Sequence, residues 1–377
     1  MPRINRFIVP LLLVVLVLSA CQPIQAPAEQ IPASAAAPTV LAAPAGQPVH
    51  APRMELQQFD FASQALAGNL VGDPATRTIF VLLPPDYATS TRRYPVLYVL
   101  PWGTSESALT VPDFRIATES LLKKGKIPGL ILVFPDGANK FGASLFGSSP
   151  VIGDYESYLV HELVNYVDAN YRTLPARESR ALAGCSNGGD PTMRLALKYP
   201  EVFSVAAPSG GVYDEALESN AFLLKELETL SKLPETITEV SNLSASSPYP
   251  LTAWFIEAAA ARVPNADNPP LLLDMPFRII NGHAEIVPEV AARIAEQDSA
   301  HEARRYVEQP LRLRGILIQH GLLDRYNPTE QVRAFDSLLT SLGIEHEYQE
   351  IDGGHCANRW EEITLEFVAN HLLFEEP

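Results

Sequence analysis

The sequence predicts an α/β fold built on a mostly parallel central sheet with helices on both faces. From Met54 onward, short apolar runs alternate with segments of helical periodicity. Several of these runs are apolar without interruption, as strands covered on both faces of a sheet should be. Alternation of this kind is typical of a parallel sheet, whose reactive groups lie at the carboxyl ends of its strands.

Seven short apolar runs are the predicted strands. They are Thr78–Leu83, Pro95–Leu100, Gly129–Phe134, Arg180–Gly184, Phe203–Ala207, Gly315–Gln319 and His346–Ile351. Between them lie segments whose apolar residues form one stripe with a helical period. The clearest predicted helices are Tyr155–Ala169, Thr329–Leu342 and Glu361–Phe374.

One region interrupts this alternation, between residues 211 and 309. It contains helical pieces and two proline-rich stretches but no clear strand. We expect it to be a helical, cap-like excursion that leaves the sheet and walls a site. A single domain over residues 54–377 would then contain both the sheet and the excursion.

The amino terminus has the order of an export signal. Arg3 and Arg6 precede the apolar run Phe7–Leu18, which is shorter than the roughly 20 residues that span a bilayer. The ending Leu18-Ser19-Ala20-Cys21 resembles the bacterial lipoprotein box. We therefore expect residues 1–20 to be removed and Cys21 to carry lipid, which would anchor an exported protein to the bacterial membrane. The alternative is a plain signal peptide with an incidental cysteine.

Composition limits the partners of the chain. Residues 21–53 are rich in Pro and Ala and have no amphipathic period, so we expect a semi-extended tether there. The formal net charge is −16 and no basic cluster interrupts it. This balance argues against nucleic acid and against anionic lipid, both of which recruit Lys and Arg. Membrane contact is therefore expected only through the lipid anchor.

The strongest local motif is Gly184–Gly189, with the sequence GCSNGG. It follows a predicted strand and opens a helical segment, which is the context that a G-x-S-x-G nucleophile elbow requires. Small residues are needed around the serine because the turn is strained and a neighbouring strand lies close. Ser186 is therefore the candidate nucleophile. The alternative is a glycine-rich turn with an incidental serine.

A serine hydroxyl needs a base to remove its proton and an acid to orient that base. In this kind of fold the chain order is Ser, then Asp or Glu, then His. His355 lies in a glycine-containing turn after the last predicted strand, and Asp324 lies just past the strand before it. We therefore expect Asp324 as the acid and His355 as the base. Asp352, on the same short turn as His355, is an alternative acid.

An oxyanion hole should combine the backbone N–H of the residue after the nucleophile with one from the loop after the third strand. The first condition indicates Asn187, and the second indicates the segment Pro101–Thr104. Because proline has no N–H, the donor would be Trp102 or Thr104, and we favour Thr104.

With these residues in place, the chain resembles the putative esterase family, which includes enterochelin esterases, esterase D, feruloyl esterases and mycolyltransferases. The similarity runs from about Leu56 to the end. Its segments are Gly72–Arg77, Tyr94–Leu100, Phe134–Gly137, Ser149–Val151 with the following helix, and Tyr171–Thr173. The resemblance implies an α/β-hydrolase fold, carboxylic-ester chemistry and no metal or organic cofactor. It also implies that Ser186, Asp324 and His355 are nucleophile, acid and base.

The sequence departs from that family at two places. Trp102-Gly103 stands where the family usually has His-Gly, which gives the site a large aromatic wall. Cys185 and Cys356 flank the predicted nucleophile and base, an arrangement that resembles tannases and some feruloyl esterases, where the pair forms a disulfide. With Cys21 acylated, these are the two cysteines left for an oxidising compartment, which favours the bridge. Two unrelated free thiols are the alternative.

The resulting hypothesis is a serine carboxylic-ester hydrolase that works through an acyl-enzyme. Its substrates would be small-molecule or glycan esters, such as feruloyl-type or other acyl esters of sugars or siderophores. Trp102 and Trp254 are candidate contacts for an aromatic acyl group, although aromatic residues of the excursion can equally be core. Two alternatives are an acyltransferase with the same triad and a catalytically silent, glycan-binding lipoprotein.

Overall fold

The computed structural model describes residues 39–40, 53–214, 221–230, 232–246, 250–356 and 359–375. All of them belong to one compact unit, residues 35–377. The predicted export signal, Cys21 and most of the predicted tether lie outside the described residues, so their assignments stay predictions. In the part of the chain that is described, no helix combines the length and the apolarity needed to cross a membrane.

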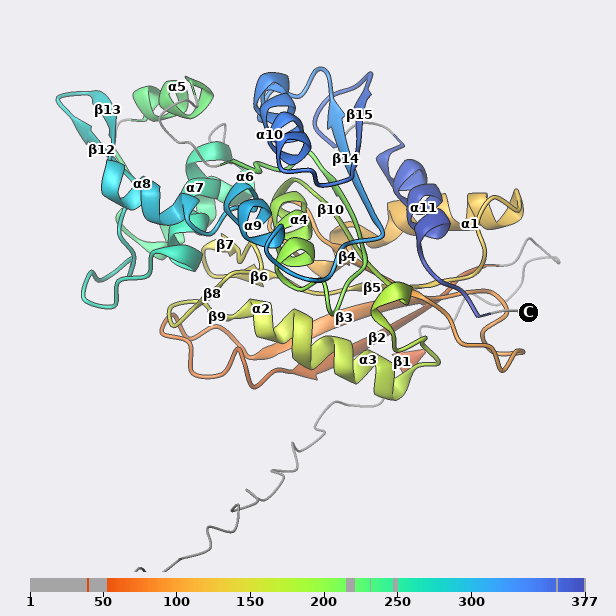
Figure 1. Ribbon diagram of the computed structural model, residues 1–377. Helices are drawn as coiled ribbons and strands as arrows, with labels where there is room; N and C mark the ends of the chain where they lie inside the picture. The colour runs from red at the N-terminus through yellow and green to blue at the C-terminus, as the bar shows by residue number, and fades with distance from the viewer. Residues whose placement is uncertain are drawn as a thin grey trace, which may run out of the picture. The chain divides into compact units, whose positions relative to one another are not determined.

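The central sheet confirms the predicted α/β architecture (Figure 1). Within the described residues it has nine strands. In spatial order they are β1 (Thr39–Val40), β2 (Glu55–Ala62), β3 (Thr76–Leu83), β5 (Ile131–Phe134), β4 (Val96–Leu100), β10 (Arg180–Cys185), β11 (Val205–Ser209), β14 (Gly315–Gly321) and β15 (Glu347–Ile351). The β1–β2, β2–β3 and β3–β5 pairs are antiparallel, and every pair from β5 to β15 is parallel.

All seven predicted strands are present, with boundaries that differ by a few residues. Strand β4, β5 and β10 residues are all buried, which explains their unbroken apolar sequences. Strand β11 runs two residues past the predicted end and includes Pro208. The sequence prediction stopped short of Pro208 because proline cannot donate to a sheet ladder. Strand β2 was missed because its first half is polar and only partly buried.

Helices cover both faces of the sheet. Those of the sheet-packing layers are α1 (Val111–Lys123), α2 (Tyr155–Ser157), the π-helical turn η2 (Tyr158–Leu163), α3 (Val164–Asn170), α4 (Gly189–Lys198), α10 (Thr329–Ser341) and α11 (Trp360–His371). Short 3₁₀ turns are η1 (Ser107–Leu109), η3 (Arg177–Ser179) and η4 (Ser186–Gly188). Helices α1 and α11 lie side by side and pack on one face (Figure 1). The segment α2–η2–α3 covers the other face.

Alternate residues of the central strand β4 pack on opposite faces of the sheet. In β4, Val96, Tyr98 and Leu100 belong to the core beneath α2–η2–α3, whereas Leu97 and Val99 belong to the core beneath α1 and α11. This is the period-two geometry of a strand. An apolar residue at every position is therefore required, and the site must lie at the strand ends.

The segment 211–309 is mainly helical, as expected, but the expectation that it lacks a strand is wrong. Its helices are α5 (Ala221–Thr229), α6 (Ile237–Ser246), α7 (Pro250–Arg262), α8 (Pro288–Ala295) and α9 (Ser299–Tyr306). Strands β12 (Phe277–Ile280) and β13 (His283–Ile286) form an antiparallel hairpin between α7 and α8. Asn281 and Gly282 join them with positive φ angles of 53° and 82°. An Asn-Gly pair between short runs is the sequence signal that the prediction overlooked.

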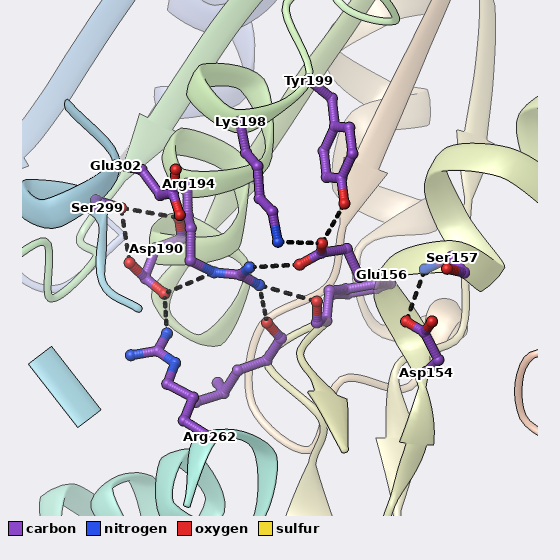
Figure 2. A network of polar contacts seen from close by, with 12 residues as sticks. Asp154, Glu156, Ser157, Asp190, Arg194, Lys198, Tyr199, Arg262, Ser299 and Glu302 are labelled. Carbon is purple, nitrogen blue, oxygen red and sulfur yellow. Dashed lines mark hydrogen bonds and ion pairs between the residues drawn. The ribbon is translucent and has the colours of Figure 1, made fainter. Parts of the chain in front are cut away.

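Two smaller hairpins lie before α2. They are β6 (Ala138–Asn139) with β7 (Gly142–Ala143), and β8 (Ser148–Ser149) with β9 (Gly153–Asp154). Glu156, at the start of the α2 segment, fastens this region to α4 (Figure 2). Its carboxylate accepts hydrogen bonds from Arg194 Nη1 at 2.9 Å, Lys198 Nζ at 2.5 Å and the Tyr199 hydroxyl. A buried carboxylate with three donors keeps its charge.

We predict that Glu156→Gln makes the free energy of unfolding depend less on pH in the acidic range. Burial would raise the pKa of Glu156, but Arg194, Lys198 and Tyr199 outweigh it and lower the pKa from 4.5 to about 2. The ionised form therefore adds stability that is complete above pH 4.5 and is lost as the pH falls towards 2. The variant should lose up to about 3 kcal/mol near neutral pH, and this difference should shrink below pH 4.5.

Urea unfolding at a series of pH values measures this difference. The matched control is Glu366→Gln, which removes one partner of an exposed ion pair with Lys126. That change should stay within about 0.5 kcal/mol at every pH. A Glu156→Gln deficit that is the same at pH 3 and pH 7 would contradict the prediction.

Candidate active site

The turn from β10 into α4 is strained at Ser186, whose φ is 57°. The glycines around it are required by space. A Cβ at Gly188 would lie 2.3 Å from the Leu100 carbonyl oxygen, at the end of the neighbouring strand β4. A Cβ at Gly184 would lie 2.4 Å from the Gly188 carbonyl oxygen. The backbone therefore adopts the sharp strand-to-helix turn that the motif GCSNGG predicts, with Ser186 at its apex.

Asp324 and His355 lie together, joined by a hydrogen bond of 2.7 Å between Asp324 Oδ2 and His355 Nδ1. Asp324 follows β14 and His355 follows β15, so two loops at the same edge of the sheet meet here. The other carboxylate oxygen of Asp324 accepts the backbone N–H groups of Tyr326 at 2.9 Å and Asn327 at 3.2 Å. Asp352, the alternative acid, is not the carboxylate that holds this imidazole.

The carboxylate of Asp324 is poised to remain ionised. Its side chain is fully buried, and burial by itself would raise the pKa of Asp324. The hydrogen bond and charge of His355, with the two backbone N–H groups, outweigh burial and bring the pKa below 3.8. An ionised Asp324 favours the tautomer in which His355 Nδ1 carries the proton, which leaves Nε2 free to accept one.

The imidazole of His355 is packed on two sides. The ring of Tyr326 meets it edge to face, with 4.9 Å between the ring centroids. On another side lies Gly210, directly after β11, where a Cβ would come within 3.3 Å of His355 Cε1. A side chain there would press on the imidazole, and the φ of 53° at Gly210 also favours glycine. Sequence reasoning did not single out Gly210, although a Gly-Gly pair at the end of a buried strand was a signal.

Ser186 and His355 line one pocket of about 170 Å³. The other lining residues come from loops and from α7. They are Trp102, Gly103, Asn187, Gly210, Val212, Leu251, Trp254, Tyr326, Asn327 and Cys356. Trp102 is 38% exposed at this pocket and Trp254 is 5% exposed, so both predicted aromatic contacts reach it. Because Leu251 and Trp254 belong to α7, the excursion supplies one wall.

The predicted oxyanion segment lies beside the elbow. The side-chain amide of Asn187 donates to the Gly103 carbonyl oxygen at 2.5 Å. Trp102 and Gly103 line the pocket, and Thr104 follows them half-buried. The backbone N–H roles of Asn187 and Thr104 stay predictions.

A buried carboxylate that sequence reasoning missed also lies at this point. Glu257 Oε2 is 3.5 Å from the Asn187 side-chain amide. Glu257 is the one carboxylate in the otherwise apolar stretch of α7, and this was its signal. Val212, Leu251 and Tyr326 were missed too, because nothing local marks an apolar side chain as a pocket wall.

Cys185 and Cys356 form a disulfide, with 5.9 Å between their Cα atoms. This confirms the predicted pairing, and the alternative of two free thiols is wrong. The bridge ties the end of β10, directly before Ser186, to the turn directly after His355. It therefore connects covalently the two segments that carry the predicted nucleophile and base.

Among the described residues, no group of three or more His, Cys, Asp or Glu side chains is arranged to hold a metal ion. The chemistry that the described groups offer is that of a hydroxyl, an imidazole and a carboxylate.

The sheet order, the elbow and the Asp–His pair define the α/β-hydrolase class, and solved structures have the same fold. A ferulic acid esterase superposes with a TM-score of 0.57 at 14% identity, covering 85% of this chain and 99% of its own. An S-formylglutathione hydrolase from Staphylococcus aureus has a TM-score of 0.54 at 14% identity, covering 84% and 98%. Identities this low show the fold alone.

The chain belongs to the family described as putative esterase, whose model matches residues 74–371. An esterase of Mycobacterium tuberculosis is 30% identical over 281 residues, which are 73% of this chain and 51% of that protein. An endo-1,4-beta-xylanase/feruloyl esterase of Xylanibacter ruminicola is 33% identical over 145 residues, 36% of this chain and 20% of that protein. The chain thus spans about half the length of the first of these relatives, and less of the second.

We predict that breaking the disulfide lowers turnover more than substrate binding. The bridge closes a loop of 171 residues, and its loss removes the covalent tie between the His355 turn and the elbow. Cys356→Ser should therefore lower kcat for p-nitrophenyl acetate by about tenfold or more while KM changes less. Chain entropy allows a stability loss of at most roughly 5 kcal/mol, so activity is measured well below the unfolding midpoint.

Cys185→Ser is the matched variant, because it opens the same bridge from the other side. Both variants should show the same split between kcat and KM. Intact mass after alkylation of the denatured, unreduced domain should show no label on Cys185 or Cys356 of the wild type. Two labelled cysteines there, or an unchanged kcat in both variants, would contradict the prediction.

Proposed function

We propose that the protein is a serine carboxylic-ester hydrolase that acts through an acyl-enzyme. The observation that carries the proposal is the 2.7 Å hydrogen bond from the buried Asp324 to His355, which lines one pocket together with Ser186 at a strained turn. Membership of the putative esterase family supports it. So does the ionised state of Asp324, which suits the orientation and charge stabilisation of a histidine base.

In the first half of the reaction, His355 Nε2 accepts the proton of the Ser186 hydroxyl while Oγ attacks the acyl carbon. Asp324 holds the Nδ1 proton and stabilises the imidazolium that forms. The negative charge that develops on the acyl oxygen would be met by the backbone N–H groups of Asn187 and Thr104. His355 then returns the proton to the alcohol oxygen, which leaves as the ester bond breaks.

In the second half, water replaces the alcohol. His355 takes one proton from that water as its oxygen attacks the acyl carbon of the acyl-enzyme, and the proton then passes to Ser186 Oγ. The products are a carboxylic acid and the free enzyme. No further reactant is required.

The lining of the pocket favours an apolar or aromatic acyl group. Trp102, Leu251 and Trp254 provide apolar surface close to Ser186. One relative is named as a feruloyl esterase in part, which agrees with this lining. We therefore infer feruloyl-type or other acyl esters of sugars or siderophores as the substrate class.

We predict that Ser186→Ala abolishes ester turnover and leaves the fold intact. The substitution removes one hydroxyl from a turn that the surrounding glycines determine. Loss of one triad member should reduce kcat by several orders of magnitude, because the three residues act as a unit.

Hydrolysis of p-nitrophenyl acetate and labelling with a fluorophosphonate probe measure the loss. The control is Ser337→Ala, which removes an exposed hydroxyl from α10 and should change neither readout. A folded Ser186→Ala protein that keeps more than about a tenth of the wild-type activity would show that Ser186 is not the nucleophile.

We also infer that the mature protein is held on the outer side of a bacterial membrane by lipid on Cys21. The sequence Leu18-Ser19-Ala20-Cys21 supports this inference. Stable anchoring needs more than one acyl chain, and a lipoprotein amino terminus has at least two. Cys21→Ser should therefore move the protein from the detergent phase to the aqueous phase in a partitioning assay. Unchanged partitioning would disprove the anchor.

A further inference from the structure

A buried ion pair connects the helix that begins at the elbow with the helix that walls the pocket (Figure 2). Asp190 lies on α4, one turn after Ser186, and its side chain is buried. Its Oδ2 accepts a hydrogen bond from Arg262 Nη2 at 2.6 Å. Its Oδ1 accepts one from the hydroxyl of Ser299, on α9, at 2.7 Å. Three helices therefore meet at one carboxylate.

Arg262 is the last residue of α7, and the pocket wall lies near the other end of the same helix. Leu251 and Trp254 contact the pocket, and Trp254 is eight residues before Arg262, about 12 Å along a helix. Because a helix is stiff, a displacement at the Arg262 end is transmitted to Trp254. The position of this wall thus depends on what holds Arg262.

The apolar contacts at the Arg262 end of α7 provide little register of their own, whereas Leu251, Trp254 and Phe255 pack into the core nearer the start of the helix. Residues 258–261 are four successive alanines, all buried, so this end of α7 is nearly smooth. Two packed helices hold one relative position because the side chains of one fit between those of the other. Alanine side chains are too short to interlock in this way. The polar contacts near this end supply it instead: Ser149 Oγ donates to the Ala260 carbonyl oxygen at 2.7 Å, and Arg262 binds Asp190.

A buried ion pair often adds little to net stability, and in some proteins it serves to fix one geometry. Two charges taken out of water recover their desolvation cost only when they meet with good hydrogen-bond geometry. A small shift of α7 relative to α4 would separate the Asp190 and Arg262 side chains and expose that desolvation cost. The pair therefore selects one position of α7.

We propose that Asp190 and Arg262 are positioning residues that determine acyl-chain selectivity. They fix α7 relative to the helix that carries the nucleophile turn, and so set how far Trp254 and Leu251 stand from Ser186. Neither residue lines the pocket: Arg262 acts through α7, and Asp190 acts by holding Arg262 from α4. This inference rests on the proposed esterase function, because selectivity is defined by ester turnover.

The first experiment compares a short and a longer acyl chain, p-nitrophenyl acetate and p-nitrophenyl hexanoate. In Asp190→Asn the amide oxygen can still accept a hydrogen bond from Arg262, but the negative charge that faces the guanidinium is lost. KM for the hexanoate should rise about tenfold, and kcat/KM for the acetate should change less than about threefold. Arg262→Lys, which retains the charge, should lie closer to the wild type than Arg262→Met.

The matched control is Asp274→Asn. Asp274 pairs with Arg293 at 2.7 Å in the same segment, but that pair is exposed. In this control, the ratio of kcat/KM for the acetate to kcat/KM for the hexanoate should match that of the wild type. A purely structural role for Asp190 would instead lower kcat/KM for both esters by the same factor. That result in a folded Asp190→Asn protein would overturn the proposal.

The second experiment does not require turnover. In a Trp102→Phe background, the remaining tryptophans are Trp254 and Trp360, and Trp360 is buried in the core beneath α1 and α11. Asp190→Asn should increase quenching by acrylamide, because the Trp254 wall loosens. If the wild type hydrolyses neither ester, the proposed function fails while this measurement still tests the coupling.

The proposal is refuted if folded Asp190→Asn shows the same acrylamide quenching and the same selectivity between the two esters as the wild type. Should Asp190→Asn fail to fold, Arg262→Lys and Arg262→Met are measured in the same way. Equal ratios and equal quenching in those two variants and the wild type would refute it equally.

Discussion

Contact of backbone with backbone behind Ser186 is the constraint on which the rest of the site depends. The first turn of α4 approaches the end of β4 so closely that Gly188 has no room for a methyl group. This approach accompanies the positive φ of Ser186, whose side chain lines the pocket. Strands β11, β14 and β15 are parallel neighbours, so their carboxyl ends lie at the same edge of the sheet. Short loops after these strands then bring Gly210, Asp324 and His355 together beside the pocket that Ser186 lines.

Asp324 and Asp190 are both buried carboxylates near this turn, but their different partners give them different roles. Asp324 meets the imidazole of His355 and two backbone N–H groups, which together offset the cost of burial. Asp190 meets the guanidinium of Arg262 and the hydroxyl of Ser299, and its Oδ2 also lies 3.9 Å from Arg194 Nε on its own helix. The first carboxylate therefore orients a group that moves protons, and the second compensates a fixed positive charge at the end of α7. The same kind of side chain performs two tasks because the surrounding donors differ.

The base and the pocket wall are attached to the turn by bonds of different kinds. The turn after His355 is tied to the end of β10 by the covalent bridge between Cys185 and Cys356. The wall provided by α7 is tied by an ion pair and by hydrogen bonds from Ser149 and Gln297. A covalent bridge yields only to reduction, whereas a buried ion pair depends on the charge and reach of both side chains. On the function proposed, the bridge keeps base and nucleophile in register, and the ion pair keeps the wall at one distance from Ser186.

Local patterns in the sequence determined the strands, the elbow and the order of acid and base. Unbroken apolar runs marked β4, β5 and β10 because both of their faces are buried, and the glycine spacing marked Ser186 because only glycine fits beside it. The same reasoning missed β2, which is polar in its first half, and the hairpin at Asn281-Gly282. Tertiary structure alone decided that Gly210 lies against His355, Glu257 beside Asn187 and Arg262 on Asp190. The physical reason is that a local pattern reports which face of its own element a residue occupies. Which residue of a distant element it meets depends on how the elements pack, and that is settled only when the chain folds.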